Sequence, residues 1–562
     1  MYKRILSLFL ISCICSAFLL PVAATSEKDS APLPLGENIS TAAVNKDVII
    51  IVPGTMGSEL KYGSTLVWSP NDSSESAINC FKWIACGETG TPSYTITPYI
   101  GDSYGTQETY ITLYTTLYNT YNSSTCDVKF FAYDWRLSCV GAAESLRTLI
   151  SGYNGKIYIV AHSMGGLVAS QYIKNATTSQ KNRTTIITLG TPFQGSPKAV
   201  NVFENGAMFD DLVGTLIVNS FIKSVVPNFP SAYELLPTIR HPFFLMQEES
   251  TLTYASSMNF LKTRDWALKS NGTVKPMFST ADTFLSNLGY GSSHVIYNAA
   301  NVYHIVSDGH DTVSKINYRL ESGSYHTDYL AISNAGDGTV LTQSARNGLA
   351  ASNSKVFTYS SVGDHTEMVS NSTVLSKVKT LINATRSSSI SSPPSIQDQT
   401  TPQSVNDRGW IVGDEFDNRR IIVNINHGGC GELFLSNGEV IQNIGESLFY
   451  TDQNGTETKV GSLLKTGTGY QYVLYDNSYI FSCPDISKSS DIVVRYLNDG
   501  YYEKIEEYSD LTDAPISISI SGYQNKLTQV SSLIDGPSDD IATFIPTSKN
   551  YSLDELNALN TQ

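Results

Sequence analysis

Short apolar runs alternate with helical stretches between Asp47 and about residue 385. The clearest runs are rich in Val and Ile: Val48–Val52, Asp127–Ala132, Lys156–Ala161, Thr185–Leu189 and Val302–Val306. Continuous apolar runs of this length are typical of parallel strands that are buried on both faces. The pattern therefore predicts an α/β fold with a parallel sheet over residues 47–385.

The pattern changes beyond residue 385. Residues 386–408 are rich in Ser, Pro and Gln, which predicts a linker. After it, short alternating runs are separated by Gly and Asn turns, such as Ile421–Ile425, Tyr470–Leu474 and Ile516–Ile520. Alternation of this kind predicts an all-β accessory domain over residues 409–562.

The chain begins with the pattern of an export signal. Lys3 and Arg4 precede an apolar run from Ile5 to Leu20, and small residues follow it at Val22-Ala-Ala24. The run is shorter than a membrane-spanning helix needs, so a signal peptide over residues 1–24 is predicted, followed by a leader over 25–46. We expect a secreted protein; a lipoprotein-type site at Cys13, and with it attachment to the cell surface, stays open.

The net charge of the chain excludes one class of binding partner. The chain has 37 Lys and Arg residues against 52 Asp and Glu residues, a formal charge of −15 at pH 7. A chain this acidic is repelled by phosphate, so nucleic acid is excluded as a partner. A hydrophobic content of 41% excludes a wholly disordered chain.

Six cysteines outside the signal fall into three local pairs, and an oxidising destination favours pairing them as disulfides. The predicted pairs are Cys80 with Cys86, Cys126 with Cys139, and Cys430 with Cys483. No pair has Cys-x-x-Cys spacing and no His-Glu-x-x-His occurs, so we expect no structural zinc site.

The candidate nucleophile lies in Lys156-Ile-Tyr-Ile-Val-Ala-His-Ser-Met-Gly-Gly-Leu-Val168. This segment predicts a strand, a tight turn at Ser163 and a helix. Ala161 and Gly165 are small, as a strained nucleophile turn requires where strand and helix converge. The positive end of the helix dipole would favour an oxyanion near Ser163. The alternative is a serine in an ordinary strand–helix turn.

The expected chain order of such a site is serine, acid, histidine, with each residue following a strand. Asp337 lies in a Gly-flanked turn, and His365 follows the apolar run Lys355–Tyr359. We predict that Asp337 orients the imidazole and that His365 takes the proton of Ser163. The competitors for these roles are Asp308, Asp311, Asp364 and His162.

Seven motifs in this order resemble the lecithin:cholesterol acyltransferase family of α/β-hydrolases, including its phospholipase A members. They are Ile51-Val-Pro-Gly-Thr-Met-Gly-Ser-Glu-Leu60, Ala132-Tyr-Asp-Trp-Arg136, Ala161-His-Ser-Met-Gly-Gly166, Leu189-Gly-Thr-Pro-Phe-Gln-Gly-Ser-Pro-Lys-Ala199, Pro230-Ser-Ala-Tyr-Glu-Leu-Leu-Pro237, Gly336-Asp-Gly-Thr-Val340 and His365-Thr-Glu-Met368. The resemblance covers about residues 45–385. It implies an α/β-hydrolase fold with an inserted cap or lid, ahead of the C-terminal all-β domain.

The resemblance also implies roles for site residues. Ser163, Asp337 and His365 match the catalytic triad, and the loop Pro53–Gly57 implies oxyanion donors in the backbone N–H groups of Thr55 and Met164. A loop that follows the Val48–Val52 strand is where this fold takes its second oxyanion donor. The alternative for the loop is a structural glycine turn.

The expected function is hydrolysis or O-acyl transfer of a phospholipid or another acyl lipid at a membrane or lipid interface. The reaction would pass through an acyl-enzyme on Ser163 and need no metal or organic cofactor. The alternative is a surface adhesion or glycan-binding protein whose hydrolase-like domain is inactive. Which surface ligand the C-terminal β domain binds is not indicated by the sequence.

Two aromatic segments carry further expectations. In Ala132–Arg136 we expect Asp134 and Arg136 to form a buried polar support beside a packed Trp135, without a chemical role. Residues 67–86 are interpreted as a lid that senses a lipid interface, and its candidate contacts are Trp68, Phe81, Trp83 and Ile84. The alternative is that these four side chains pack in the core.

Overall fold

In the computed structural model, the described residues are 44–68, 74–100, 109–206, 215–238, 244–387, 404–405, 411–412, 419–444, 447–452, 454–483, 490–498, 501–509, 511, 516–520 and 549–561. The predicted signal peptide, residues 1–24, lies outside these ranges, as do most of the leader 25–46 and most of the linker 386–408. The boundaries predicted for the domains stay predictions. No helix among the described residues is both long and apolar enough to cross a membrane.

A six-stranded parallel sheet forms the centre of the N-terminal part, in the order β13-β10-β7-β6-β1-β5. Each strand falls on a predicted apolar run: β1 Asp47–Val52, β5 Cys126–Phe130, β6 Ile157–His162, β7 Thr184–Leu189, β10 Asn301–Ser307 and β13 Val356–Tyr359. With helices on both faces, this sheet confirms the predicted α/β-hydrolase fold.

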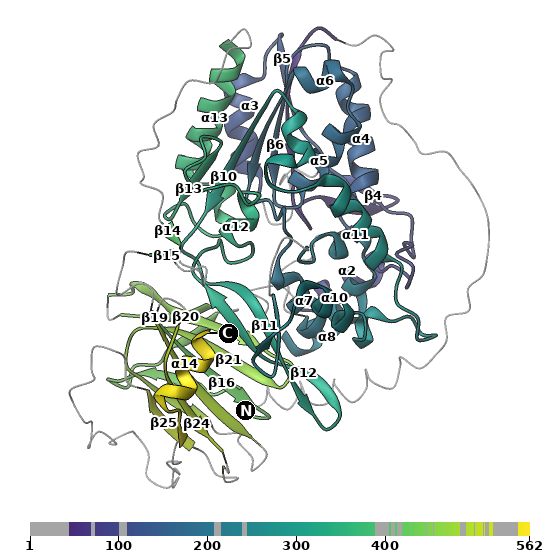
Figure 1. Ribbon diagram of the computed structural model, residues 1–562. Helices are drawn as coiled ribbons and strands as arrows, with labels where there is room; N and C mark the ends of the chain where they lie inside the picture. Colours follow the sequence, from purple (N-terminus) through teal and green to yellow (C-terminus); the bar gives the residue numbers. More distant parts are fainter. Residues whose placement is uncertain are drawn as a thin grey trace. The chain divides into compact units, whose positions relative to one another are not determined.

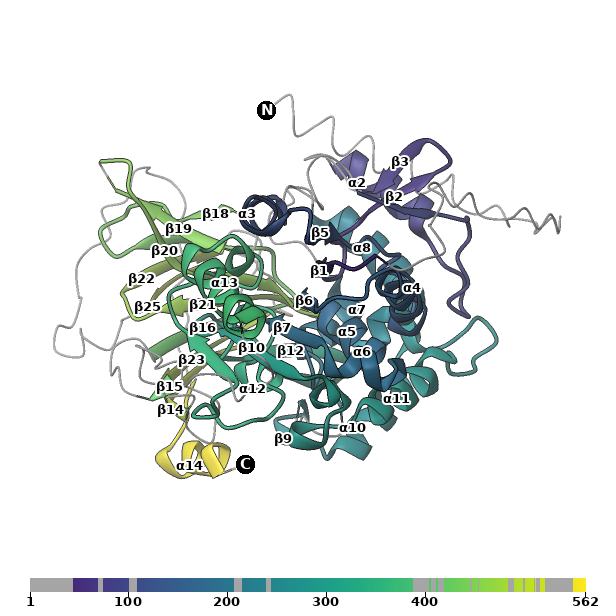
Figure 2. The same ribbon diagram turned by 90° about the horizontal axis from the view of Figure 1, so that it is seen from above.

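Helices cover both faces of this sheet. α3 (Ile111–Tyr121) and α13 (Ser372–Ser387) lie on one side, and α4 (Cys139–Ser151), α5 (Gly165–Asn175) and α6 (Thr178–Asn182) on the other (Figures 1 and 2). Alternate residues of β1 reach the two sides: Ile49 and Ile51 join the apolar cluster under α3 and α13. Val48, Ile50 and Val52 join the cluster under α4 and α5. This explains why the run has no polar position.

The inserted cap lies between β7 and β10. It consists of α7 Pro197–Asn205, α8 Thr215–Val225, η2 Val226–Asn228, α9 Pro230–Glu234, β8 Leu245–Gln247, β9 Ser250–Thr251, α10 Tyr254–Leu261, η3 Asp265–Ala267, α11 Met277–Leu288, η4 Gly291–Ser293 and η5 Val295–Asn298. After β10, the hairpin of β11 (Thr312–Glu321) and β12 (Ser324–Ser333) joins β8 and β9 in a four-stranded sheet. Two short elements, α12 (Thr342–Ala345) and η6 (Glu367–Val369), follow.

A buried carboxylate ties the cap to this hairpin. Glu204 of α7 accepts hydrogen bonds from Arg264 Nε at 2.9 Å and from Trp266 Nε1 at 2.8 Å. It also accepts from the hydroxyl of Tyr318 in β11 at 3.0 Å. A buried charge is tolerated only when it is paired and hydrogen-bonded, which Glu204 is. The cap is therefore held in place by polar contacts as well as by apolar packing.

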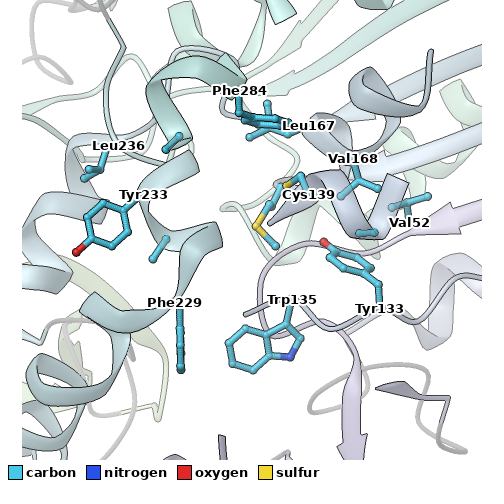
Figure 3. Packing of buried hydrophobic residues seen from close by; sticks show 14 of the residues in the cluster. Val52, Tyr133, Trp135, Cys139, Leu167, Val168, Phe229, Tyr233, Leu236 and Phe284 are labelled. Carbon is cyan, nitrogen blue, oxygen red and sulfur yellow. The ribbon is translucent and has the colours of Figure 1, made fainter. Parts of the chain in front are cut away.

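A small three-stranded sheet follows β1 in the N-terminal part. β2 (Glu59–Tyr62) pairs with β3 (Thr65–Trp68) and with β4 (Thr97–Tyr99), and α2 spans Ser74–Ile84. The indole of Trp135 packs against Trp68 of β3, and Figure 3 shows it between Phe229 and Tyr133. These residues belong to the larger of the two apolar clusters of the parallel sheet.

The C-terminal part is built from antiparallel strands, as predicted. One sheet has the order β18-β19-β20-β21-β16-β23-β24-β26 and a second the order β17-β22-β25. The bounds are β14 Ser404–Val405, β15 Ile411–Val412, β16 Arg419–Asn426, β17 Glu432–Leu435, β18 Gln442–Ile444, β19 Ser447–Thr451, β20 Glu457–Lys465, β21 Gly469–Tyr475, β22 Tyr479–Cys483, β23 Asp491–Asn498, β24 Tyr501–Tyr508, β25 Ile516–Ile520 and β26 Lys549–Asn550. One helix, α14 (Leu553–Thr561), packs against β24, so this part is not purely β.

Buried polar contacts join the two kinds of sheet. The amide of Gln471 in β21 pairs with the backbone of β12, accepting from Leu330 N–H and donating to Leu330 C=O, both at 2.7 Å. Arg420 of β16 forms an ion pair with Asp311 at 3.0 Å, and both side chains are almost fully buried. A side chain that satisfies both backbone groups of a neighbouring strand acts as a substitute for a strand partner.

The predicted disulfides are absent from the structure, which holds Cys86, Cys126, Cys139 and Cys430 as free thiols. Cys126 opens β5 in the cluster under α3 and α13, whereas Cys139 opens α4 in the cluster on the opposite side of the sheet. The pairing of these two was therefore wrong, because the sheet lies between them. Cys86 is a free thiol that lies 4.0 Å from the carbonyl of Ile84, so the predicted bond between Cys80 and Cys86 is not formed.

The third predicted pair is not formed either. The Cys430 thiol lies 3.1 Å from the hydroxyl of Tyr472, and the Cys483 thiol lies 3.6 Å from the carbonyl of Gly429. Proximity in sequence predicts neither the face of a sheet nor the direction of a Cβ vector, which together decide whether a disulfide can form.

Replacement of Gln471 by Ala is expected to destabilise the protein. It leaves the N–H and C=O of Leu330 buried without partners, which costs about 1–3 kcal/mol. The melting temperature should fall, whereas the exposed Gln442→Ala variant of β18 should melt like the wild type. Equal melting temperatures for the two variants would mean that Gln471 does not hold β12.

Candidate functional site

Ser163 occupies a sharp turn between β6 and α5. Its backbone has φ +52°, in the left-handed region that a residue with a Cβ seldom adopts. A Cβ on Gly165 would collide with the carbonyl of Val52, and one on Gly166 with the side chain of Thr191. The two glycines therefore let the helix start directly against β1, and the turn lifts Ser163 above the sheet.

Asp337 and His365 are brought together by the loops that follow the hairpin and β13. His365 Nδ1 donates to Asp337 Oδ2 at 2.7 Å, and the His365 N–H donates to the Asp337 carbonyl, also at 2.7 Å. The other carboxylate oxygen accepts from the N–H groups of Thr339 at 3.0 Å and Val340 at 2.7 Å. The carboxylate is fully buried and fully hydrogen-bonded. Because it accepts the hydrogen bond from Nδ1–H, the proton of the neutral imidazole stays on Nδ1, and Nε2 of His365 is free to accept a proton.

His162 lies between Ser163 and the histidine loop. Its ring centroid is 4.7 Å from that of His365, and its Nε2 donates to the His365 carbonyl at 2.9 Å. Burial, with the neighbouring His365 adding to it, holds the pKa of His162 well below its usual range, so this ring is neutral. Among the described residues, Ser163 Oγ makes no hydrogen bond.

The loop after β1 lies against the nucleophile. A Cβ on Gly54 would be 2.7 Å from that of Ser163, so only glycine fits there. Thr55 Oγ1 lies 3.5 Å from the sulfur of Met164, which places the two predicted oxyanion residues side by side. Among the described residues, neither the Thr55 nor the Met164 N–H donates to a protein acceptor. Two free N–H groups beside a serine can receive the oxygen of an acyl carbonyl.

Two tyrosines hold this loop, and the sequence analysis did not identify either as a site residue. The hydroxyl of Tyr133 donates to the carbonyl of Pro53 at 2.8 Å. The hydroxyl of Tyr110 accepts from the Gly54 N–H at 2.8 Å and lies 2.7 Å from Nδ1 of His162. Tyr133 lies within a motif that resembles the family, but Tyr110 stands in no motif, so no sequence signal pointed to it.

Gly190, which belongs to the Leu189–Ala199 motif, is a further residue of the site. It has φ +56°, and a Cβ there would lie 2.9 Å from Asp337 Oδ2 and 3.1 Å from His365 Nδ1. Its neighbour Leu189 accepts the N–H of Ser163 at 2.9 Å. The end of β7 therefore positions the serine and leaves room for the acid–histidine pair.

The competing acids lie elsewhere. Asp308 is buried and accepts from the Gly309 N–H at 2.8 Å and from Thr342 Oγ1 at 3.2 Å. Burial, together with a smaller effect of the nearby Asp337, raises the pKa of Asp308 to about 6. Asp311 is paired with Arg420, and Asp364 caps the backbone of its own turn. None of these three carboxylates hydrogen-bonds the imidazole of His365 among the described residues.

The interpretation of residues 67–86 as a lid was wrong for three of its four contacts. Trp68, Phe81 and Ile84 are fully buried. Trp68 packs edge-to-face on Trp135 at 5.0 Å between ring centroids, because β3 and α2 close over the core at this point. These side chains are core residues and cannot contact a lipid surface.

Trp83 is the exception, because it is 36% exposed. Its ring stacks on Tyr62 at 5.2 Å and lies 5.1 Å from the ring of Tyr94. Tyr62 and Tyr94 are 44% and 42% exposed, so three aromatic rings meet at the surface. We call Tyr62, Trp83 and Tyr94 the aromatic cluster.

The polar support in Ala132–Arg136 is confirmed. Arg136 is fully buried and grips Asp134 with two hydrogen bonds, at 2.8 and 2.6 Å, and donates to the carbonyl of Ile84 at 2.7 Å. Trp135 is fully buried and donates from its indole to Ser58 at 3.1 Å. Asp134, Trp135 and Arg136 thus bind α2 and the loop after β1 to the sheet.

A cavity of about 160 Å³ lies in the cap, beside the loop that follows β7. It is lined mainly by apolar and aromatic side chains of α9, α10, α11 and that loop: Phe193, Tyr233, Leu236, Tyr254, Phe278 and Leu285. Among the described residues there is no group of three or more His, Cys, Asp or Glu side chains that could hold a metal ion.

Part of the chain matches a known protein family, and several solved structures resemble the chain weakly. Residues 97–295 match the family described as lecithin:cholesterol acyltransferase. An uncharacterised protein of Saccharomyces cerevisiae is 35% identical over 106 residues, which is 17% of this chain and 16% of that protein. The chain therefore spans only about a sixth of the length of this curated relative.

Among solved structures, a chain of the Tle4–Tli4 complex is 14% identical with a TM-score of 0.45, over 61% of this chain and 99% of that one. The mature lipase BlEst2 of Bacillus licheniformis is 13% identical with a TM-score of 0.28, over 62% and 96%. The lin2722 product of Listeria innocua is 13% identical with a TM-score of 0.24, over 60% and 94%. Over residues 97–295, which include the Ser163 turn, the chain thus matches the lecithin:cholesterol acyltransferase family that its motifs resemble.

Proposed function

We propose that the protein is a secreted serine lipid acyl hydrolase or O-acyltransferase. The observation that carries the proposal is the Asp337–His365 hydrogen bond of 2.7 Å, set beside a serine in a strained strand–helix turn. The match of residues 97–295 to the lecithin:cholesterol acyltransferase family supports lipid acyl esters as the substrate class. The signal-like N-terminus supports export.

In the proposed first step, Ser163 Oγ attacks the acyl carbonyl while its proton passes to Nε2 of His365. The Asp337 carboxylate stabilises the imidazolium that forms. The carbonyl oxygen becomes an oxyanion and is held by the N–H groups of Thr55 and Met164. Collapse of this intermediate breaks the ester bond, and the departing lysolipid oxygen takes the proton from His365.

The second step releases the acyl group. Water or a lipid alcohol gives its proton to His365 and attacks the acyl-enzyme, which yields a free fatty acid or a new ester and restores Ser163. Both outcomes share one acyl-enzyme, so the acceptor decides between a phospholipase and an acyltransferase. These steps use only side chains and backbone groups of this chain.

Two features favour an acyl lipid over a small polar ester. The cavity of the cap includes Phe193 of the loop that follows β7, and its aromatic and aliphatic side chains, which lie beside Asp282 and Ser286, suit a hydrocarbon chain with a polar end. The aromatic cluster offers rings that combine an apolar face with a polar edge, which is the composition that suits a membrane–water boundary. We propose that it contacts the lipid surface.

Ser163→Ala should abolish turnover, because the acyl-enzyme cannot form. The loss should be at least ~10³-fold on a soluble short-chain ester. Labelled phosphatidylcholine liposomes with and without sterol should then yield free fatty acid or steryl ester with the wild type only. The matched control is Ser170→Ala in the same helix, whose hydroxyl donates to the carbonyl of Gly166 at 2.7 Å. Turnover by Ser163→Ala at the rate of Ser170→Ala would contradict the proposal.

Asp337→Asn and Asp308→Asn should differ sharply. The first removes the acceptor for His365 Nδ1 and should lower kcat about 10⁴-fold. The second removes a carboxylate that does not contact the imidazole, so kcat should change little. The reverse ranking would make Asp308 the catalytic acid.

Asp308→Asn should also change how stability depends on pH. The pKa of Asp308 is raised from 3.8 to about 6, so the folded protein holds this proton more tightly than the unfolded chain. Wild-type stability should therefore fall as the pH rises between these values, and the Asn variant should lack this fall. Denaturant midpoints measured across the window test it.

Trp83→Ser should depress turnover on liposomes several-fold and spare a soluble ester, because it removes one ring of the aromatic cluster. Tyr118→Ser is the matched control, since Tyr118 is 42% exposed on α3 and lies outside the cluster. An equal loss on both substrates, together with a lower melting temperature, would assign Trp83 a purely structural role.

A further inference from the structure

We propose that Tyr110 and His162 are positioning residues, linked in a hydrogen-bond chain that fixes the oxyanion loop to the His365 loop across the nucleophile. The chain runs from the Gly54 N–H through the Tyr110 hydroxyl and the His162 ring to the His365 carbonyl. This inference rests on the proposed function, because it assigns the two ends of the chain to the reacting groups.

The direction of every bond in the chain is determined by its ends. The His365 carbonyl can only accept, so His162 Nε2 carries a proton and donates to it at 2.9 Å. His162 is neutral, so its Nδ1 bears a lone pair and accepts from the Tyr110 hydroxyl at 2.7 Å. With its proton committed, the Tyr110 oxygen accepts from the Gly54 N–H at 2.8 Å.

The environment keeps both side chains in the protonation states that this direction needs. Tyr110 is 2% exposed and His162 is 5% exposed. Burial raises the pKa of Tyr110, so the phenol keeps its proton. Burial lowers the pKa of His162, so the ring does not take a second proton, which would place two donors face to face at Nδ1.

One end of the chain acts on the oxyanion loop. Gly54 has no room for a Cβ because Ser163 lies against it, and its N–H is taken up by Tyr110. The next N–H along the loop is that of Thr55, which has no protein acceptor among the described residues. Tyr110 therefore determines which donor of the loop is available to the oxyanion.

The other end acts on the histidine. The His365 carbonyl is held by His162 and its N–H by the Asp337 carbonyl at 2.7 Å. Both backbone groups of His365 are thus fixed, and its ring is held through Nδ1 by the Asp337 carboxylate. Misplacement of a catalytic group by about 1 Å can cost about 10²-fold in rate, so anchoring of this kind bears directly on kcat.

Tyr110→Phe removes the hydroxyl that joins the Gly54 N–H to the His162 ring in the hydrogen-bond chain. On a soluble ester, kcat should fall about 10²-fold with KM nearly unchanged, since the geometry of the transition state is disturbed and binding is not. The matched control is Tyr121→Phe in α3, whose buried hydroxyl donates to the Lys379 carbonyl at 3.1 Å. Tyr121→Phe should lower the melting temperature and leave kcat unchanged.

Two variants of His162 test its two hydrogen bonds separately, the one to Tyr110 and the one to the His365 carbonyl. In His162→Gln the side-chain amide can still donate to the His365 carbonyl, but the bond to Tyr110 is lost. In His162→Asn the side-chain oxygen can still accept from Tyr110, but the bond to His365 is lost. Hydrogen–deuterium exchange should therefore accelerate mainly at residues 53–57 in the Gln variant and mainly at 363–368 in the Asn variant.

The exchange measurement also separates this inference from the proposed function. Faster exchange at both segments in Tyr110→Phe supports the chain, even if no ester proves to be a substrate. Failure of the proposed function would show as wild-type turnover equal to that of Ser163→Ala. The proposed hydrogen-bond chain would be overturned by unchanged hydrogen–deuterium exchange in Tyr110→Phe. It would also be overturned if Tyr110→Phe had the same kcat as Tyr121→Phe.

Discussion

The close approach of four backbone segments at one edge of the parallel sheet is the constraint on which the site depends. The loop after β1, the Ser163 turn and the start of α5 meet so tightly that Gly54 and Gly165 have no space for a Cβ, and at the end of β7 a Cβ on Gly190 would meet Asp337 and His365. Ser163 accepts a left-handed backbone at this point. Strain of this kind persists only where surrounding packing over-determines it, and β1, buried on both faces, supplies that packing.

The fold and the reacting residues could be predicted because both follow from local patterns. The apolar runs found the six parallel strands, since strands buried on both faces have no polar position. Asp337 and His365 were chosen because they follow strands in the expected order, and the structure joins them by a 2.7 Å hydrogen bond. Their catalytic roles remain a proposal.

Other features depend on contacts that no local pattern reveals. Tyr110 reaches the site from the turn before α3, and its pairing with Gly54 and His162 is set by tertiary packing alone. The predicted disulfide between Cys126 and Cys139 failed for the same reason, because spacing does not indicate which face of a sheet a cysteine occupies. Of the four aromatic or apolar residues assigned to a lid, only Trp83 remained at the surface. Apolar clusters between polar residues are ambiguous, because burial depends on the elements that cover them.

The order of the strands has a kinetic consequence. The site draws on segments from Gly54 to His365, and β1 pairs with strands that come much later in the chain, for example Val48 with Ile157. Pairings between distant segments carry a large loop-closure entropy and form slowly. The proposed site draws on segments from both ends of this part of the chain, so a chain in which only one of them has folded would lack the site. Under the proposed function, a serine-directed label would therefore react only with molecules in which these segments have folded together.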